Sequence, residues 1–102
     1  MKQLLGKQMT SDITATLEQR GQRYGNFLLH AELSQDLKAC IEEGLASREK
    51  VLAAEQAEAL QMICHKIGRI INGDPDYADS WHDIAGYAQL VADRLNEQEV
   101  QM

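Results

Sequence analysis

Apolar residues recur along this chain at intervals of three and four positions, the spacing that places side chains on one face of an α-helix. The pattern is clearest over residues 53–71 and 79–95, where the intervals alternate between three and four, as in helix bundles. The positions are Ala57, Leu60, Cys64, Ile67 and Ile71 in the first segment, and Trp81, Ile84, Ala88, Val91 and Leu95 in the second. Each segment is therefore predicted to form a helix that buries this stripe.

Two further helices are predicted nearer the N-terminus. In residues 11–20, Ile13 and Leu17 lie one turn apart, and a hydroxyl or carboxyl oxygen of Thr10, Ser11 or Asp12 caps the helix. In residues 26–45 the apolar stripe consists of Phe27, Ala31, Leu37, Cys40 and Ile41. These two segments bring the expected number of helices to about four.

Glycines and a single proline separate the predicted helices. Asn72-Gly73 followed by Pro75 is a strong stop, because glycine can take the left-handed conformation and proline cannot continue a helix. The period-two alternation of β-strands is absent. The pattern predicts an all-α fold, a compact bundle forming a single domain over residues 11–95. We expect residues 1–10 to be a flexible N-terminus and residues 96–102 to be a frayed tail.

Size and charge narrow the classes of partner. A chain of 102 residues buries a modest fraction of its surface, so homodimerisation is expected to stabilise it. The net charge of −6 repels phosphate backbones, which argues against nucleic-acid binding. No stretch approaches the roughly 20 apolar residues of a membrane span. Because residues 1–9 contain no sustained apolar run, we do not expect them to be a secretory signal. Cys40 and Cys64 are predicted to be free, buried thiols, as in a reducing bacterial cytoplasm.

Four acidic residues form two pairs at helical spacing. Glu55 and Glu58 are three positions apart, and Asp79 and Asp83 are four apart, so each pair shares a helix face. Mg²⁺ prefers hard oxygen ligands, and carboxylates from adjacent helices suit it. Alternatively, Asp79 is a helix cap and both aspartates are favoured by the positive end of the helix dipole. The spacing leaves both interpretations open.

Candidate ligand-binding residues lie near these acids. Lys66 and Arg69 are suited to phosphate, and Tyr87 lies one turn beyond Asp83. If no ligand is bound, either cation can pair with an aspartate of the neighbouring helix. His30, His65 and His82 show no zinc-ligand spacing, and we expect them to be ordinary surface or core histidines.

A short motif, Tyr24-Gly25-Asn26-Phe27, precedes the second predicted helix. Gly25 allows a sharp turn, which would project Tyr24 and Asn26 from the entrance of that helix, where ligands often bind. The alternative is a plain turn that is followed by Phe27 as a hydrophobic anchor.

Three segments of the chain resemble signatures of small uncharacterised phage and prophage proteins. They are residues 23–27, residues 65–75 and the run Asp-Ser-Trp-His-Asp-Ile-Ala-Gly-Tyr-Ala over residues 79–88. More distantly, the layout is similar to the MazG-like all-α nucleotide pyrophosphohydrolases. Those enzymes hold Mg²⁺ with two acidic pairs and cleave a nucleoside triphosphate to the monophosphate and pyrophosphate. This sequence differs in that its second pair is spaced by four and is entirely aspartate.

The resemblance implies roles for individual residues. The metal ligands would be Asp79, Asp83, Glu58 and Glu55, with catalysis depending on Asp83, Asp79 and Glu58. The nucleotide would be contacted by Lys66, Arg69, Tyr87, Tyr24 and Asn26. The first hypothesis is therefore a phage-encoded, Mg²⁺-dependent nucleoside triphosphate pyrophosphohydrolase, or a nucleotide-binding protein without turnover. The second is a non-catalytic phage accessory protein that binds a host or phage protein through a helix face.

Overall fold

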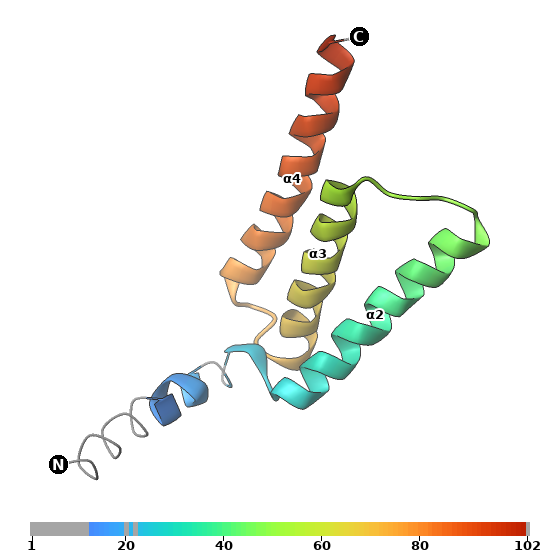
Figure 1. The fold of residues 1–102 in the computed structure, drawn as a ribbon. Coiled ribbons are helices and arrows are strands. Elements are labelled where there is room, and N and C mark those ends of the chain that lie inside the picture. The colour runs from blue at the N-terminus through green and yellow to red at the C-terminus, as the bar shows by residue number, and fades with distance from the viewer. Residues whose placement is uncertain (1–12, 20, 22, 102) are drawn as a thin grey trace, which may run out of the picture.

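A computed structural model of the chain describes residues 13–19, 21 and 23–101 (Figure 1). Its long helices are α2 (Phe27–Ser47), α3 (Ala54–Asn72) and α4 (Ala78–Gln101). Residues 13–19 are also helical, and no strand occurs in the described part of the chain. The all-helical bundle predicted from the apolar spacing is thereby confirmed. The capping residues expected at positions 10–12 and the N-terminus over 1–10 lie outside the described residues.

Side chains and turns define where α2 and α3 begin and end. The Asn26 side-chain oxygen Oδ1 accepts hydrogen bonds from the Leu28 and Leu29 amides at 2.9 and 3.3 Å, which caps the start of α2. At the start of α3, the Ala53 amide donates to Gln56 Oε1 at 2.9 Å. The end of α3 is closed by the Gly73 amide, which donates to the Arg69 carbonyl at 2.9 Å.

The central helix is α3, with α2 packed on one side and α4 on the other (Figure 1). No contact between α2 and α4 is found in the described part of the chain. Two ion pairs show the register of α3 and α4: Lys66 with Asp83, and Glu55 with Arg94. The two paired residues of α3 are eleven positions apart, and so are their partners on α4, but in the opposite order along the chain. This is the spacing expected of two antiparallel helices.

The C-terminal helix is longer than the sequence predicts. We expected a frayed tail from Asn96, but α4 continues to Gln101. No glycine or proline interrupts residues 96–101, and glutamate and glutamine are good helix formers. Because Arg94 already lies opposite Glu55 in the first turn of α3, this last part of α4 extends beyond the N-terminal end of α3 (Figure 1).

Burial is concentrated along α3. Among the described residues, the buried apolar side chains are those of Ala59 and Cys64, and the buried polar ones are those of His30, Ser34, Lys66 and Ser80. Cys64 is buried as predicted, whereas Cys40 is exposed. Several other residues predicted to be buried are exposed, namely Ile13, Leu17, Phe27, Leu60, Ile71, Trp81, Ala88 and Leu95. With three helices in a row, only the central one is covered on two sides, so large faces of the outer helices stay open.

None of the described helices combines the length and the apolar character that are needed to cross a membrane.

Candidate functional site

The predicted acidic residues have separate partners. Asp83 pairs with Lys66, at 2.9 Å between Oδ2 and Nζ, and the Lys66 side chain is only 11% exposed. The Asp79 carboxylate instead accepts a hydrogen bond from the Tyr77 hydroxyl at 2.8 Å. Glu55 lies beside Arg94, whose Nε is 4.0 Å from its carboxylate. Asp83 and Glu55 are therefore each placed beside a cation of the neighbouring helix, and Asp79 is hydrogen-bonded to a tyrosine.

The register of α3 and α4 explains this separation. Lys66 lies opposite Asp83, and Glu58 precedes Lys66 by eight residues, which is about 12 Å along a helix. A magnesium ion binds its oxygen ligands at about 2.1 Å and cannot bridge that gap. In the part of the chain that the structure describes, no three His, Cys, Asp or Glu side chains converge on one point. Glu58 and Asp83 are thus too far apart to share one metal ion, and the Lys66 ammonium supplies the positive charge beside Asp83.

Replacing Asp83 tests the structural role of this ion pair. Asp83→Asn leaves a largely buried ammonium without its counter-charge, so we expect the free energy of unfolding to fall by about 1 kcal/mol. The Asp83 side chain is 48% exposed, and screening by water keeps the loss that small. The measurement is urea unfolding followed by helical circular dichroism. Asp36→Asn, an exposed position of α2 without an ion pair, is the control. Equal losses in both variants would contradict the assignment.

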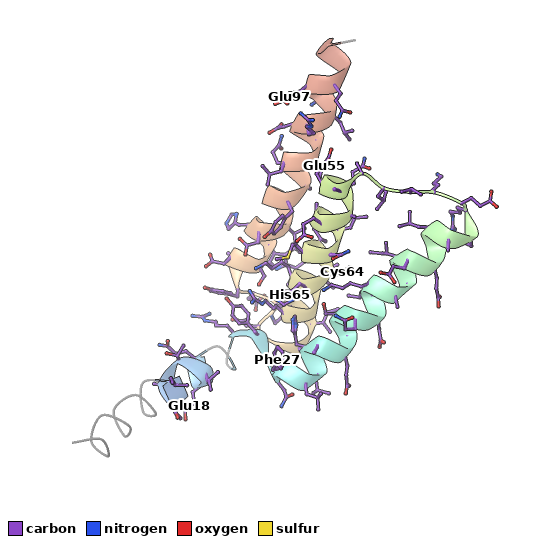
Figure 2. All side chains as sticks on the ribbon, in the orientation of Figure 1. Glu18, Phe27, Glu55, Cys64, His65 and Glu97 are labelled. Atoms are coloured by element: carbon purple, nitrogen blue, oxygen red, sulfur yellow. The ribbon has the colours of Figure 1, made fainter. Side chains whose placement is uncertain are left out.

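A cavity of about 440 Å³ lies where the start of α2 meets the C-terminal half of α3. Its volume is within the range of small-molecule sites. The lining residues are Leu17, Gly21, Tyr24, Gly25, Asn26, Phe27, His30, His65 and Arg69. Three residues that the sequence suggested for ligand binding, Tyr24, Asn26 and Arg69, therefore meet in one place. Figure 2 shows Phe27 and His65 at this end of the helices, away from Glu55 at the far end of α3.

The turn before α2 is docked on the end of α3 through its backbone. Gly25 has a φ of 81°, in the left-handed region, and a side chain added there would overlap the Asn72 carbonyl. A hydrogen bond of 2.7 Å from the Asp74 amide to the Arg23 carbonyl joins the same two segments. This contact holds Tyr24 over α3 and forms one wall of the cavity.

Two arginines stack on two tyrosines beside the cavity. The guanidinium carbon of Arg69 is 4.2 Å from the Tyr24 ring centroid, and that of Arg23 is 4.6 Å from the Tyr77 ring centroid. The two tyrosine rings meet edge to face at 6.0 Å. Such cation–π contacts hold a guanidinium in place while leaving its edge free to donate hydrogen bonds.

A pair of histidines lines the cavity. Nε2 of His30 lies 3.3 Å from Nδ1 of His65, and the two rings are nearly perpendicular. Gly68 permits this packing, because a side chain there would come within 2.7 Å of the His30 ring. Burial lowers the pKa of His65 to about 4, and Arg69 adds to the effect. Burial also lowers the pKa of His30. Both rings are therefore neutral near pH 7.

Neither His30 nor His65 was predicted from the sequence to be a site residue. A signal was present, since His30 follows Asn26 by four residues and His65 precedes Arg69 by four. Each histidine thus shares a helix face with a residue that had been proposed to bind ligand.

No family model, curated protein or solved structure matches this chain.

Two shallower hollows lie between α3 and α4 or along α4. The first, of about 370 Å³, brings together three predicted residues, Glu55, Glu58 and Tyr87. The second is more open and is lined by Asp83 and Tyr87. Tyr87 thus borders both, but Asp79 lines neither of them. In neither of these two hollows do the aspartate pair and the glutamate pair meet.

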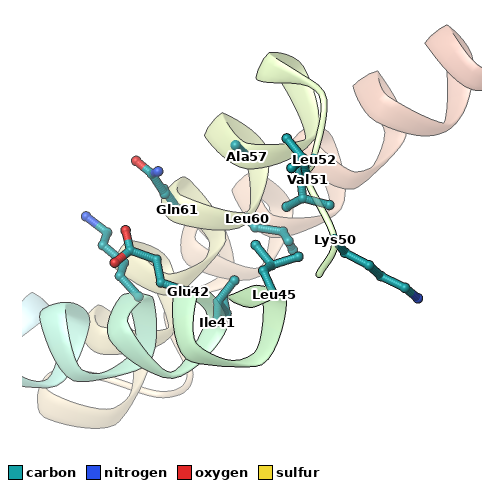
Figure 3. Close-up of a pocket in the computed structure, with 10 residues that line it drawn as sticks. Ile41, Glu42, Leu45, Lys50, Val51, Leu52, Ala57, Leu60 and Gln61 are labelled. Carbon is teal, nitrogen blue, oxygen red and sulfur yellow. The ribbon is translucent and has the colours of Figure 1, made fainter. Parts of the chain in front are cut away.

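A further pocket of about 250 Å³ lies between the C-terminal half of α2 and the start of α3 (Figure 3). Residues 50–52, which connect the two helices, cross its edge, and Ile41, Leu45 and Leu60 face into it. Its lining is mostly aliphatic and includes none of the predicted site residues.

Proposed function

We propose that the cavity at the start of α2 binds a small anionic ligand that carries a flat ring. A nucleotide is the ligand class implied by the resemblance to MazG-like proteins. The observation that supports this most directly is the convergence of Arg69, Tyr24 and the His30–His65 pair on one cavity of about 440 Å³.

The chemistry of the lining suits such a ligand. The Arg69 guanidinium can donate two parallel hydrogen bonds to a phosphate or carboxylate. The exposed ring of Phe27 offers a surface on which a heterocycle can stack. A neutral imidazole donates one hydrogen bond and accepts another, which matches the edges of a nucleobase. In a chain with a net charge of −6, a cationic cavity is a distinct feature that attracts anions selectively.

Hydrolysis is not part of this proposal. Magnesium-dependent cleavage needs carboxylates that converge beside the bound phosphates. Here Asp83 is paired with Lys66, and neither aspartate nor glutamate lines the cavity that holds Arg69. The geometry therefore favours a binding protein over an enzyme.

Arg69→Gln is the direct test of ligand binding. The wild-type protein is screened by thermal shift against a nucleotide panel, and the affinity of the best nucleotide is then measured by calorimetry. Because the variant loses a charge-assisted hydrogen bond, we expect its affinity to fall by about tenfold or more. Arg94→Gln, an exposed arginine of α4 outside this cavity, should keep the wild-type affinity.

Two outcomes would contradict the proposal. One is a flat thermal response across the panel, since a ligand that binds the native state must raise its midpoint. The other is pyrophosphate release that requires Mg²⁺ and disappears in Asp83→Asn. That result would support the pyrophosphohydrolase hypothesis and would indicate that the active site includes Asp83 of α4.

We also propose that the chain associates with a second copy of itself. Several large apolar side chains of the described helices are exposed, including Phe27, Leu90 and Trp81. Burial of such side chains between two copies would stabilise a chain of this size. This proposal takes the place of an unspecified host or phage partner, and the molecular mass in solution tests it.

A further inference from the structure

The positive groups around the cavity at the start of α2 lack acidic partners. Arg23 and Arg94 each pair with a carboxylate, whereas no carboxylate of the described chain lies within ion-pair distance of Arg69. The described residues that line the cavity include no aspartate or glutamate. The first turn of α2, which begins at this cavity, also carries no acid to offset the positive end of the helix dipole. These positive groups are therefore available to an anion.

The two histidines of the cavity are joined through one nitrogen of each ring. Nε2 of His30 faces Nδ1 of His65 at 3.3 Å, so one of these two nitrogens carries the shared proton. The other nitrogen of His30, Nδ1, is buried against Gly68 and makes no hydrogen bond of good geometry within the described chain. Burial lowers the pKa of His30, and the Gly68 backbone opposes this shift, as a carbonyl that faces a ring N–H does. The ring proton of His30 is therefore placed on Nδ1, which makes its Nε2 the acceptor and Nδ1 of His65 the donor.

The remaining nitrogen of the pair, Nε2 of His65, is open to a ligand. It is not buried and has no hydrogen-bond partner among the described residues, and its ring lines the cavity. With the proton on Nδ1, a neutral His65 presents only a lone pair at Nε2, and a lone pair repels the oxygen of an anion. Uptake of one proton from water turns Nε2 into a donor and the ring into a cation.

The charges that act on His65 are positive and come from both helices that hold the pair. Burial and four basic neighbours lower the pKa of His65 to about 4. These neighbours are Arg69 and Lys66 of α3 and His30 and Lys38 of α2. Tyr24 of the preceding turn stacks on Arg69, and Asp83 of α4 pairs with Lys66. An anion beside Arg69 would offset these positive charges and favour the protonated ring.

We propose that the cavity binds the phosphate group of its ligand together with one proton. The phosphate lies between Arg69 and His65, which are four residues apart on the same face of α3, and the proton passes from water to Nε2 of His65. Both side chains then donate charge-assisted hydrogen bonds to the phosphate oxygens. This inference rests on the proposed ligand site and adds the role of His65 within it. It follows from linkage that the ligand binds more tightly as the pH falls below 7.

Sulfate tests the proton uptake, because it resembles phosphate but keeps its charge between about pH 7.5 and pH 5.5, the range in which histidines titrate. If bound sulfate returns the pKa of His65 to its ordinary value, the affinity for sulfate should rise about tenfold from pH 7.5 to pH 5.5. Calorimetry at constant ionic strength measures the affinity, and circular dichroism checks that the chain is folded at both pH values. In an NMR titration of the histidines, the midpoint of His65 should move from about 4 in chloride toward the ordinary value in sulfate.

His65→Gln is the decisive variant, because an amide cannot take up the proton. Its affinity for sulfate should be the same at both pH values, whereas His82→Gln, at an exposed position of α4, should keep the rise in acid. A rise that persists in His65→Gln would refute the role of His65. A wild-type affinity that does not change with pH would overturn the proton uptake and leave the proposed ligand site intact. Absence of sulfate binding at both pH values would overturn the place given to the phosphate, and the nucleotide panel decides the proposed function separately.

Discussion

Gly25→Ala is expected to lower the free energy of unfolding by about 3 kcal/mol and to abolish ligand binding in the cavity at the start of α2. The backbone at Gly25 has a φ of 81°, where an alanine is strained. A methyl group there would also overlap the carbonyl of Asn72, which is part of the backbone and cannot rotate away. The turn must therefore leave the end of α3, and Tyr24 must leave Arg69.

The matched control for this prediction is Gly86→Ala. A side chain added at Gly86 meets no atom within 4 Å, and the residue lies inside α4. Because alanine is the better helix former, this variant should gain about 0.5 to 1 kcal/mol. Urea unfolding followed by circular dichroism measures both changes. Equal stability of Gly25→Ala and the wild-type protein would show that the turn is not docked on α3 as described.

The helix boundaries were largely predictable because their signals are local. The expected segment 53–71 corresponds to α3, which ends at Asn72 directly before the predicted stop at Gly73. The expected start near Asp79 corresponds to Ala78. The end of α4 was misplaced, since we took the polar character of residues 96–101 as fraying. Polarity alone does not end a helix when no glycine or proline follows.

The buried faces were harder to predict. Trp81, Ala88 and Leu95 recur at helical spacing, and so do Ile84 and Val91, because α4 is apolar on two adjacent faces. Spacing shows that a face exists but does not show which neighbouring helix covers it. The structure assigns Ile84 and Val91 to the α3 contact and leaves the other three residues exposed.

The same limit applies to the candidate sites. Helical spacing correctly indicates that Asp79 and Asp83 share a side of α4, but the register that sets Asp83 opposite Lys66 is a long-range property. The cavity at the start of α2 also depends on contacts between distant segments, such as the one between Arg23 and Asp74. Tyr24, Asn26 and Arg69 could therefore each be predicted from the sequence as a candidate ligand-binding residue. That the three line one cavity could not be predicted.

The His30–His65 pair makes the stability of the folded chain depend on pH. In the unfolded chain a histidine titrates near pH 6.5, whereas burial lowers the pKa of His65 in the folded chain to about 4. Between these values the unfolded state binds more protons than the folded state, so stability falls as the pH falls. The loss begins near pH 6.5 and is complete near pH 4. Burial of His30, which also lowers its pKa, acts in the same direction.

We expect the free energy of unfolding to fall by about 2 kcal/mol as the pH is lowered from 7 to 4. The shift of the His65 pKa to about 4 corresponds to about 3 kcal/mol, and partial exposure of the ring to water reduces this amount. His65→Gln removes the titrating group while its amide can still hydrogen-bond to His30, so urea unfolding of this variant should depend less steeply on pH over that range. His82→Gln, at an exposed position of α4, should retain the wild-type dependence. If His65→Gln loses as much stability in acid as the wild-type protein does, the histidine pair is not the source of the effect.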